Sequence, residues 1–402
     1  MTIRPIRAAA LVLVLLLAAC SDPAPKAVPS VQAPIPAEAA ALLGQAQQAF
    51  RTGDTPRALQ LADQAIGKAV LLPDAHFLKG RVYEQRQQFD AAVAAYGKAL
   101  EQDANLQGAW YNLGNIAMSQ QQFQQARQLY QREAALHPEE AYVWHGLAGA
   151  YFELGVMDSA RYAVEQALAR DAAYAPALSS MADLHRFEGT FDAGVSFAQR
   201  AAEAAPDNAG YVSKYGTMLL MAEQYAEAVP VLREAVQRQP GDPEALLNLG
   251  RALQQTGRAD EAVAFIQQAE TARQLQVEIT QAEALVRAEP NNLGHQARLA
   301  QAYQQAGRPA DALRVYRVLE TRAPNNLPLL NNIANLYIQQ GDTAAARQRL
   351  DAILTRDPSV VEAWINRGFL YRVMGQPARA QAAWAEARRL NPNHPSVLAL
   401  GR

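Results

Sequence analysis

The feature that most constrains the fold of this chain is a 34-residue period. The stretch from Gln107 to Glu140 carries large residues, small residues and a proline at fixed places, and the same pattern returns along most of the 402 residues. Counted from Ala39, seven units follow one another to Gln276, and after sixteen further residues three more units occupy residues 293–394. Self-similarity of this length is typical of repeat proteins, in which each unit buries its apolar face only against its neighbours.

Within each unit, small and large residues alternate in a way that suits helix packing. Large residues at places 4, 7, 11 and 24, such as Trp110, Leu113 and Tyr130, surround small residues at places 8 and 20. Such alternation allows two helices to cross closely at native packing density, so we interpret Trp110 and Tyr130 as core residues. Place 8 is glycine or alanine throughout: Gly80, Gly114, Ala148, Ala182, Gly216, Gly250, Ala300, Ala334 and Gly368.

Glycine and proline punctuate the units at regular positions. Glycine ends a helix readily because it adopts the left-handed conformation, and proline cannot continue a helix. We therefore expect a turn in mid-unit at Gly53, Gly155, Gly189, Gly257, Gly307, Gly341 and Gly375. We expect the second helix to stop before Pro138, Pro206, Pro240, Pro324, Pro358 and Pro392.

This pattern resembles the tetratricopeptide repeat (TPR), a helix-turn-helix hairpin that stacks on copies of itself. The resemblance implies an all-α, right-handed superhelical solenoid of about ten hairpins with one inserted helix. It places the first helix of each hairpin (helix A) on the inner, concave side. In the third unit it rests on places 4, 7, 8, 17, 20, 24 and 32, which are Trp110, Leu113, Gly114, Phe123, Ala126, Tyr130 and Pro138.

Residues 277–292 interrupt the period between the seven units of residues 39–276 and the last three. No glycine or proline occurs from Ala259 to Glu289, and apolar residues recur at helical spacing. One long helix fits this stretch, and so do two consecutive helices ending before Pro290. In either case the stacking changes here, and we expect a bend between a seven-unit arm and a three-unit arm. We expect the tail, residues 395–402, to fold back as a short cap; a dimer or partner contact is the alternative.

The N-terminus has the pattern of a secretory signal. Arg4 and Arg7 precede an apolar run over residues 8–19, which is shorter than the roughly 20 residues needed to span a bilayer. The sequence Leu-Ala-Ala-Cys ending at Cys20 resembles a bacterial lipobox, which implies removal of residues 1–19 and lipid attachment at Cys20. Ser21 after the cysteine favours the periplasmic side of the outer membrane over the inner membrane. Residues 20–36 then form the lipidated cysteine and a proline-rich tether.

Composition and residue spacing give no indication of chemistry. The net charge is −2 without a basic block, so a nucleic-acid partner is not expected. The single cysteine excludes disulfides within the chain, and the six histidines fall in different units. Neither a nucleophile elbow nor a phosphate loop nor a cluster with metal-ligand spacing occurs. We expect no cofactor, no metal and no catalytic residue, and interpret His185, at place 11, as a core histidine.

A peptide-binding groove is the candidate site that the resemblance implies. Places 2, 5, 9 and 12 of helix A face the concave side in TPR proteins, and large rings and methionine suit contact with a peptide. The alternative is that some of these residues pack on the neighbouring helix A. The groove residues predicted for the middle units are Phe77, Arg81, Tyr111, Asn115, Met118, Tyr142, His145, Phe152, Arg186, Leu220, Glu244, Leu247 and Arg251.

These observations favour a non-catalytic, membrane-anchored scaffold that binds protein or peptide segments, with the bilayer as a second partner through Cys20. Among TPR lipoproteins it resembles those that assemble envelope complexes. The alternatives are a pilotin for secretin rings or pili, an exopolysaccharide-export component, and a substrate-holding adaptor of a separate envelope enzyme. A spacer without a dedicated ligand is a further alternative. Fold alone does not decide among them.

Overall fold

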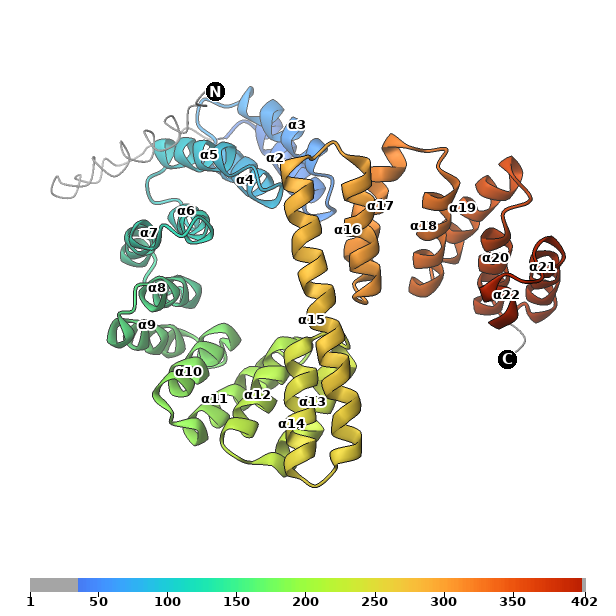
Figure 1. The fold of residues 1–402 in the computed structure, drawn as a ribbon. Helices are drawn as coiled ribbons and strands as arrows, with labels where there is room; N and C mark the ends of the chain where they lie inside the picture. The colour runs from blue at the N-terminus through green and yellow to red at the C-terminus, as the bar shows by residue number, and fades with distance from the viewer. Residues whose placement is uncertain (1–34, 400–402) are drawn as a thin grey trace, which may run out of the picture. The chain divides into compact units, whose positions relative to one another are not determined.

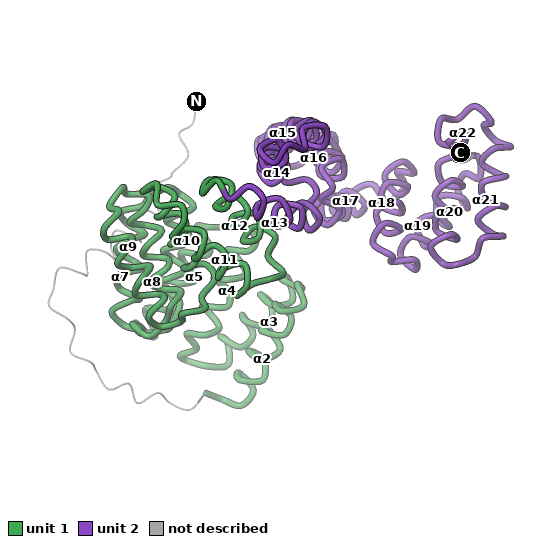
Figure 2. Tube along the Cα trace, turned by 90° about the horizontal axis from the view of Figure 1, so that it is seen from below, with its two compact units in different colours: residues 1–223 green, residues 224–402 purple. Residues whose placement is uncertain are grey.

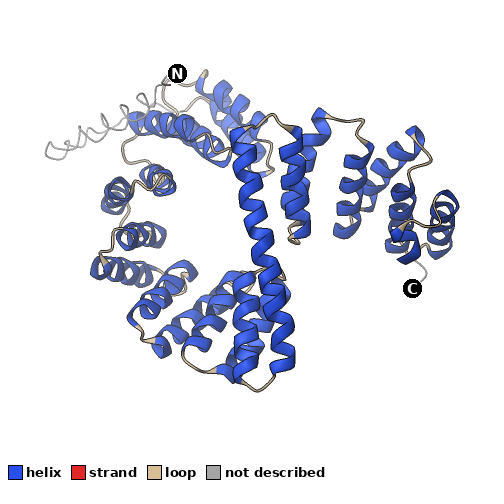
Figure 3. Cartoon of the chain, viewed as in Figure 1, coloured by secondary structure: helices blue, strands red, loops and turns tan. Residues whose placement is uncertain are grey.

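The computed structural model describes residues 35–399, and these residues form helices and connecting loops without a strand (Figures 1 and 3). The all-α prediction is confirmed. The lipobox, Cys20 and most of the tether lie outside the described residues. The chain divides into two compact units, residues 1–223 and 224–402, which are coloured separately in Figure 2.

The first compact unit holds α2–α12 and the second holds α13–α22. Each period of the sequence corresponds to one hairpin of helix A and helix B. The helices of the first unit are α2 (Ala37–Arg51), α3 (Thr55–Ile66), α4 (Pro73–Gln85), α5 (Phe89–Gln102), α6 (Ala109–Ser119), α7 (Phe123–Leu136), α8 (Ala141–Glu153), α9 (Met157–Arg170), α10 (Ala175–Glu188), α11 (Phe191–Ala204) and α12 (Ala209–Met221).

The second unit continues the same alternation until the inserted residues. Its helices are α13 (Tyr225–Arg238), α14 (Pro243–Gln255), α15 (Ala259–Ala288), α16 (Leu293–Gln305), α17 (Pro309–Arg322), α18 (Leu327–Gln340), α19 (Thr343–Arg356), α20 (Val361–Val373), α21 (Pro377–Leu390) and α22 (Pro395–Ala399). Helix B ends two residues before each of the six predicted stop prolines, from Leu136 before Pro138 to Leu390 before Pro392.

Every hairpin turn has one residue in the left-handed conformation, always at place 15. The seven predicted glycines all have positive φ, between 68° and 80°. In the other three turns the residues at place 15 are Gln87, Gln121 and Glu223, with φ of 58°, 60° and 59°. The turn geometry is therefore common to all ten units, and three of them adopt it without glycine.

The close crossing at place 8 explains the small residues there. A Cβ on Gly80 would lie 2.5 Å from the Tyr96 ring, and one on Gly114 would lie 2.6 Å from the Tyr130 ring. Both tyrosines are at place 24 of the same hairpin and are fully buried, as the core interpretation of Tyr130 requires. The aromatic ring thus occupies the space that a side chain at place 8 would need.

The inserted residues do not form a separate helix. Residues 277–288 extend helix B of the seventh unit into a single helix, α15, of 30 residues, and the last inserted residues lead into α16. Its first half packs on α14 and its second half on α16, where Ile279 and Ala282 are buried beside Tyr303 (Figure 1). The expected change in stacking is confirmed within the second unit. The predicted bend concerns arms that extend across both compact units, and it stays a prediction.

The described part of the C-terminal tail, residues 395–399, folds back as expected. Helix α22 places Val397 in a small core with Ile365 and Ala387. Trp384 is partly buried and its Nε1 donates to the carbonyl oxygen of Ile365. The tail therefore covers part of the last hairpin.

Candidate functional site

The predicted groove residues of the first unit lie on helices A, and in Figure 1 α6 and α8 follow the inner side of its curve while α7 and α9 lie outside. The structure brings Tyr111, Asn115 and Tyr142 together in the middle of this surface. The Tyr111 and Tyr142 rings meet edge to face with centroids 4.7 Å apart, and Tyr111 also contacts Tyr130 at 5.5 Å. The rings of Tyr111 and Tyr142 are partly exposed, so they present an aromatic surface.

Space for this aromatic pair comes from the next helix. A Cβ on Gly146 of α8 would lie 2.9 Å from both Tyr111 and Tyr130. Gly146 is at place 6, where several other units have asparagine. The glycine thus leaves room beside α8 for both tyrosines of the third unit, Tyr111 and Tyr130.

Burial also raises the pKa of the groove tyrosines. It raises the pKa of Tyr111, and it raises the pKa of Tyr142 and Tyr174 to about 12. Their phenol groups are therefore neutral at physiological pH and can donate hydrogen bonds. Asn115 accepts a 2.7 Å hydrogen bond from the Tyr130 hydroxyl, so this groove residue also holds a core ring in place.

His145 extends the aromatic surface toward α10. Its ring contacts Tyr174 edge to face at 5.8 Å, and its Nε2 lies 3.1 Å from the Ser180 hydroxyl. Burial, with a smaller effect from Lys214, lowers the pKa of His145. The imidazole is therefore neutral at physiological pH.

A polar cluster follows the aromatic surface. Asp183 on α10 pairs with Lys214 on α12 at 2.5 Å and with Arg186 at 3.6 Å. The Arg186 side chain is about half exposed. The cluster offers both charges to a ligand, with the cations already oriented by one carboxylate.

The remaining predicted residues are more dispersed. Phe77 and Arg81 line a pocket of about 520 Å³ between α2 and α4, where the Arg81 guanidinium lies 4.8 Å above the Phe50 ring. Met118 and Leu220 are partly buried, and Phe152 is exposed at the end of α8. Leu247, Arg251 and Glu244 lie on α14 in the second unit. The other ten predicted residues all belong to the first compact unit.

Several residues of this surface were absent from the sequence prediction. Asp183 is at place 9, like Arg81 and Asn115, so the 34-residue period was sufficient to predict it as a groove residue. Tyr174 is at place 34, in the loop before α10, and Lys214 is at place 6. Only the folded chain brings these two residues beside His145. His185, predicted as a core residue, stacks on Phe197 at 5.4 Å and contacts the Thr190 hydroxyl.

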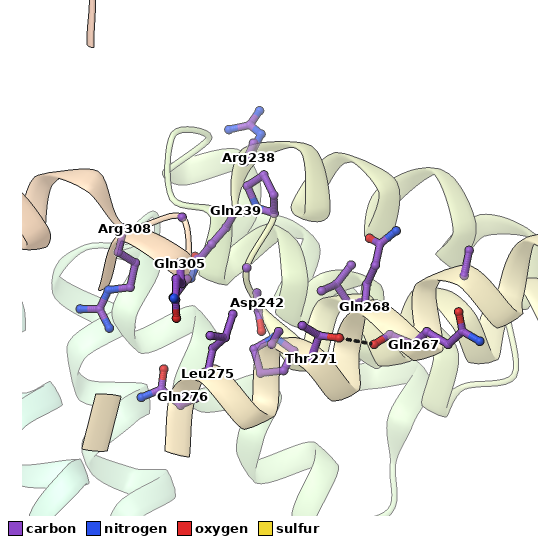
Figure 4. A pocket seen from close by; sticks show the side chains of 18 residues that line it. Arg238, Gln239, Asp242, Gln267, Gln268, Thr271, Leu275, Gln276, Gln305 and Arg308 are labelled. Atoms are coloured by element: carbon purple, nitrogen blue, oxygen red, sulfur yellow. Dashed lines mark hydrogen bonds between the residues drawn. The ribbon is translucent and has the colours of Figure 1, made fainter. Parts of the chain in front are cut away.

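A second hollow lies in the second unit, beside the middle of α15. This cavity of about 890 Å³ is bounded by the α13–α14 connection, residues 264–276 of α15 and the α16–α17 turn (Figure 4). It exists because α16 ends beside the start of α14: a Cβ on Gly241 would lie 2.8 Å from the Ala306 carbonyl oxygen. Glutamine side chains dominate its wall, among them Gln267, Gln268 and Gln305.

Between residues 35 and 399, no grouping of histidine, cysteine, aspartate and glutamate has the arrangement of a metal site. The same part of the chain has no helix whose length and apolar character would suffice to cross a bilayer.

Comparison with known families identifies the repeat. Models described as "Tetratricopeptide repeat" match residues 39–64, 111–176, 180–243, 219–285, 305–365 and 337–401, and one described as "TPR repeat" matches residues 80–120. Together with the ten hairpins, these matches show that the chain belongs to the tetratricopeptide repeat family. Its fold is that of a scaffold for protein–protein interaction.

Two curated proteins are similar to parts of the chain. Cellulose synthase operon protein C of Xanthomonas axonopodis pv. citri (strain 306) is 28% identical over 241 residues, which are 55% of this chain and 16% of that protein. Tetratricopeptide repeat-containing protein trd-1 of Caenorhabditis elegans is 28% identical over 106 residues, 25% of this chain and 14% of that protein. The chain thus spans less than a fifth of the length of either relative.

Solved structures with similarity to the chain include YrrB, described as a TPR protein with an unusual peptide-binding site. It is 20% identical with a TM-score of 0.37, and the match covers 46% of this chain and 95% of that one. Naa15/Naa10 bound to HypK-THB is 17% identical with a TM-score of 0.33, covering 90% of this chain and 59% of that one.

Proposed function

We propose that the protein is a non-catalytic scaffold that binds an extended peptide segment of a partner in the groove of its first compact unit. The observation that carries the proposal is the aromatic surface of Tyr111, Tyr142, His145 and Tyr174, which continues into the charged cluster at Asp183. Flat amphipathic rings bury much area at little entropic cost, and their neutral phenols donate to peptide carbonyls. The ligand expected is a segment with apolar side chains and a charged residue at one end.

The same proposal includes attachment to a membrane. The lipobox-like sequence ending at Cys20 supports lipidation, and several acyl chains, at ~0.8 kcal/mol per buried CH₂, hold a protein on a bilayer essentially permanently. Residues 21–36 contain several prolines and favour an extended tether of roughly 3.1 Å per residue. The scaffold would then act at the periplasmic side of the outer membrane; the periplasmic face of the inner membrane is the alternative.

Within the envelope, we favour a role in assembling a multiprotein complex. The similarity to cellulose synthase operon protein C favours a polysaccharide-export complex over a secretin or pilus pilotin. An adaptor that holds the substrate of a separate enzyme is distinguished from this role by one measurement: the purified protein would be inert alone but would change the rate of that enzyme.

The experiment that tests the groove compares two double variants in cells by crosslinking and mass spectrometry. Tyr142→Ala with Arg186→Glu removes one ring of the aromatic surface and reverses one charge of the cluster at Asp183. The control, Tyr162→Ala with Arg57→Glu, makes the same changes on helices B. Loss of the captured partner in the first variant alone, with unchanged helicity by circular dichroism, supports the groove. If the groove variant and the control variant both still capture the partner, the groove is excluded as the binding site. If neither double variant has a phenotype but deletion of residues 21–36 does, a spacer without a ligand is favoured.

A further inference from the structure

The first half of α15 has an exposed apolar face, whereas corresponding apolar residues of other helices B are covered by the next helix A. At place 24 the corresponding side chains Tyr96, Tyr130, Tyr316 and Leu350 are buried, whereas Ile266 is 37% exposed. At place 21, Val93 and Leu313 are buried, whereas Val263 is 55% exposed. The difference arises because the helix A that follows α15, α16, packs only on its second half. One stacking position beside α15 therefore lacks a helix.

The exposed face continues along the helix for the length of one helix A. Val263, Glu270 and Val277 are seven residues apart and so share one side of α15, and Val277 is also 55% exposed. At 1.5 Å per residue, Val263 and Val277 are about 21 Å apart, and a helix A such as α14, with 13 residues, is about 20 Å long. The apolar positions thus match a single helix of that size.

Three acidic residues on or beside this face lack partners, and they outnumber Arg273, which lies seven residues after Ile266 on the same side of α15. Asp260, Glu270 and Glu278 are exposed, and none of them forms an ion pair or side-chain hydrogen bond with another described residue. By contrast, Glu261 is held by Arg233 and Arg258, and Glu283 accepts from Tyr303. Arg273 is the only basic residue between Ala259 and Val286. The net charge along this face is therefore negative, and an occupant with complementary charge is basic.

We propose that α15 binds a basic amphipathic helix of a partner protein, which takes the stacking position that a helix A occupies elsewhere in the array. Its apolar side contacts Val263, Ile266 and Val277, and its lysine or arginine residues pair with Asp260, Glu270 and Glu278. This helix-in-groove mode differs from the extended peptide proposed for the first compact unit, and neither proposal depends on the other.

The test uses the full-length protein and two labelled model peptides of about 15 residues, each with leucine on one helical face. One peptide has lysine at its polar positions and the other has glutamate. Fluorescence anisotropy should show at least tenfold tighter binding of the lysine peptide, with a gain of peptide helicity by circular dichroism. Glu270→Lys with Glu278→Lys should weaken this binding at least tenfold. Val263→Asn with Val277→Asn should weaken it as well, because it removes the apolar contact.

The control variant, Glu165→Lys with Glu203→Lys, makes the same charge change on the exposed surface of α9 and α11. It should leave binding unchanged; an equal loss in the control would show nonspecific attraction and overturn the proposal. Unchanged binding by the α15 variants would overturn it too. If the protein is a dimer that Glu270→Lys with Glu278→Lys dissociates in light scattering, the occupant is a second copy and the partner helix is excluded.

Discussion

Tyr142 meets Tyr111 edge to face across two neighbouring hairpins, with ring centroids 4.7 Å apart. The contact joins place 2 of one unit to place 5 of the preceding one, so it spans an interface that repeats along the array. In this unit the interface is aromatic on both sides, and it is also the centre of the proposed groove. Packing between units and the proposed ligand binding therefore involve the same rings.

We expect Tyr142→Leu to reduce stability by about 0.5–1.5 kcal/mol, because the edge-to-face pair contributes that amount beyond its buried area. Urea unfolding of Tyr142→Leu, Tyr111→Leu and the double variant gives the coupling energy between the rings. Additive effects of the two substitutions would show that the rings do not interact.

Gly146→Ala should destabilise the protein by about 1–3 kcal/mol, because the new methyl group would overlap Tyr111 and Tyr130 and force them to move. The matched control is Gly149→Ala on the same helix, where the only neighbour of the new Cβ is Met118 at 3.9 Å. That substitution should be neutral or stabilise the helix by up to about 1 kcal/mol. Thermal unfolding of both variants measures the difference, and equal effects would contradict the role of Gly146.

Gln121→Gly should increase stability by about 0.5–1 kcal/mol, because a glutamine with φ of 60° carries a left-handed strain that glycine lacks. The reverse change, Gly155→Gln, exchanges the same two residue types at place 15 of the next hairpin. It should destabilise the protein by a similar amount. Chemical denaturation of the two variants tests the sign. A loss of stability in Gln121→Gly would show that the side chain itself stabilises its turn.

His145 should make the protein less stable in mild acid. Burial lowers its folded pKa below the unfolded value of 6.5, so the unfolded chain binds a proton first as the pH falls. The contribution of His145 to stability is therefore largest above pH 6.5 and decreases as the pH falls through the lowered folded pKa. Urea unfolding between about pH 7.5 and 5 should show a smaller slope in His145→Gln than in the wild type. An unchanged slope would assign the effect to other groups.

Glu133 should have the opposite pH dependence. The carboxylate is fully buried and accepts from the backbone N–H groups of Gly108, at 2.5 Å, and Tyr111, at 3.2 Å. Burial raises its pKa, so stability decreases as the pH rises from the unfolded value of 4.5 through the raised folded pKa. Glu133→Gln should remove this dependence. Glu133→Ala should cost about 1–3 kcal/mol, because it leaves those N–H groups without their partner.

The period in the sequence was sufficient to predict the hairpins, their turns and their stop positions, because each depends on residues within one unit. It was insufficient where contacts join different units. Tyr174 and Lys214 lie beside predicted groove residues, although their places, 34 and 6, are not among the places expected to face the groove. Glu133 is at place 27, which is alanine in most units, and its burial under the start of α6 follows from the left-handed Gly108. The inserted residues fitted one helix or two, since local propensity alone does not choose between them.

The length of α15 has a consequence for how the second compact unit unfolds. A repeat array normally opens by loss of one hairpin at a time, since each hairpin is a separate cooperative element joined to its neighbours. Here the hairpin of α14 and the hairpin of α16 and α17 are built on one uninterrupted helix. The central segment from α14 to α17 should therefore exchange its amide hydrogens as a single cooperative block, while the hairpins toward the C-terminus exchange individually.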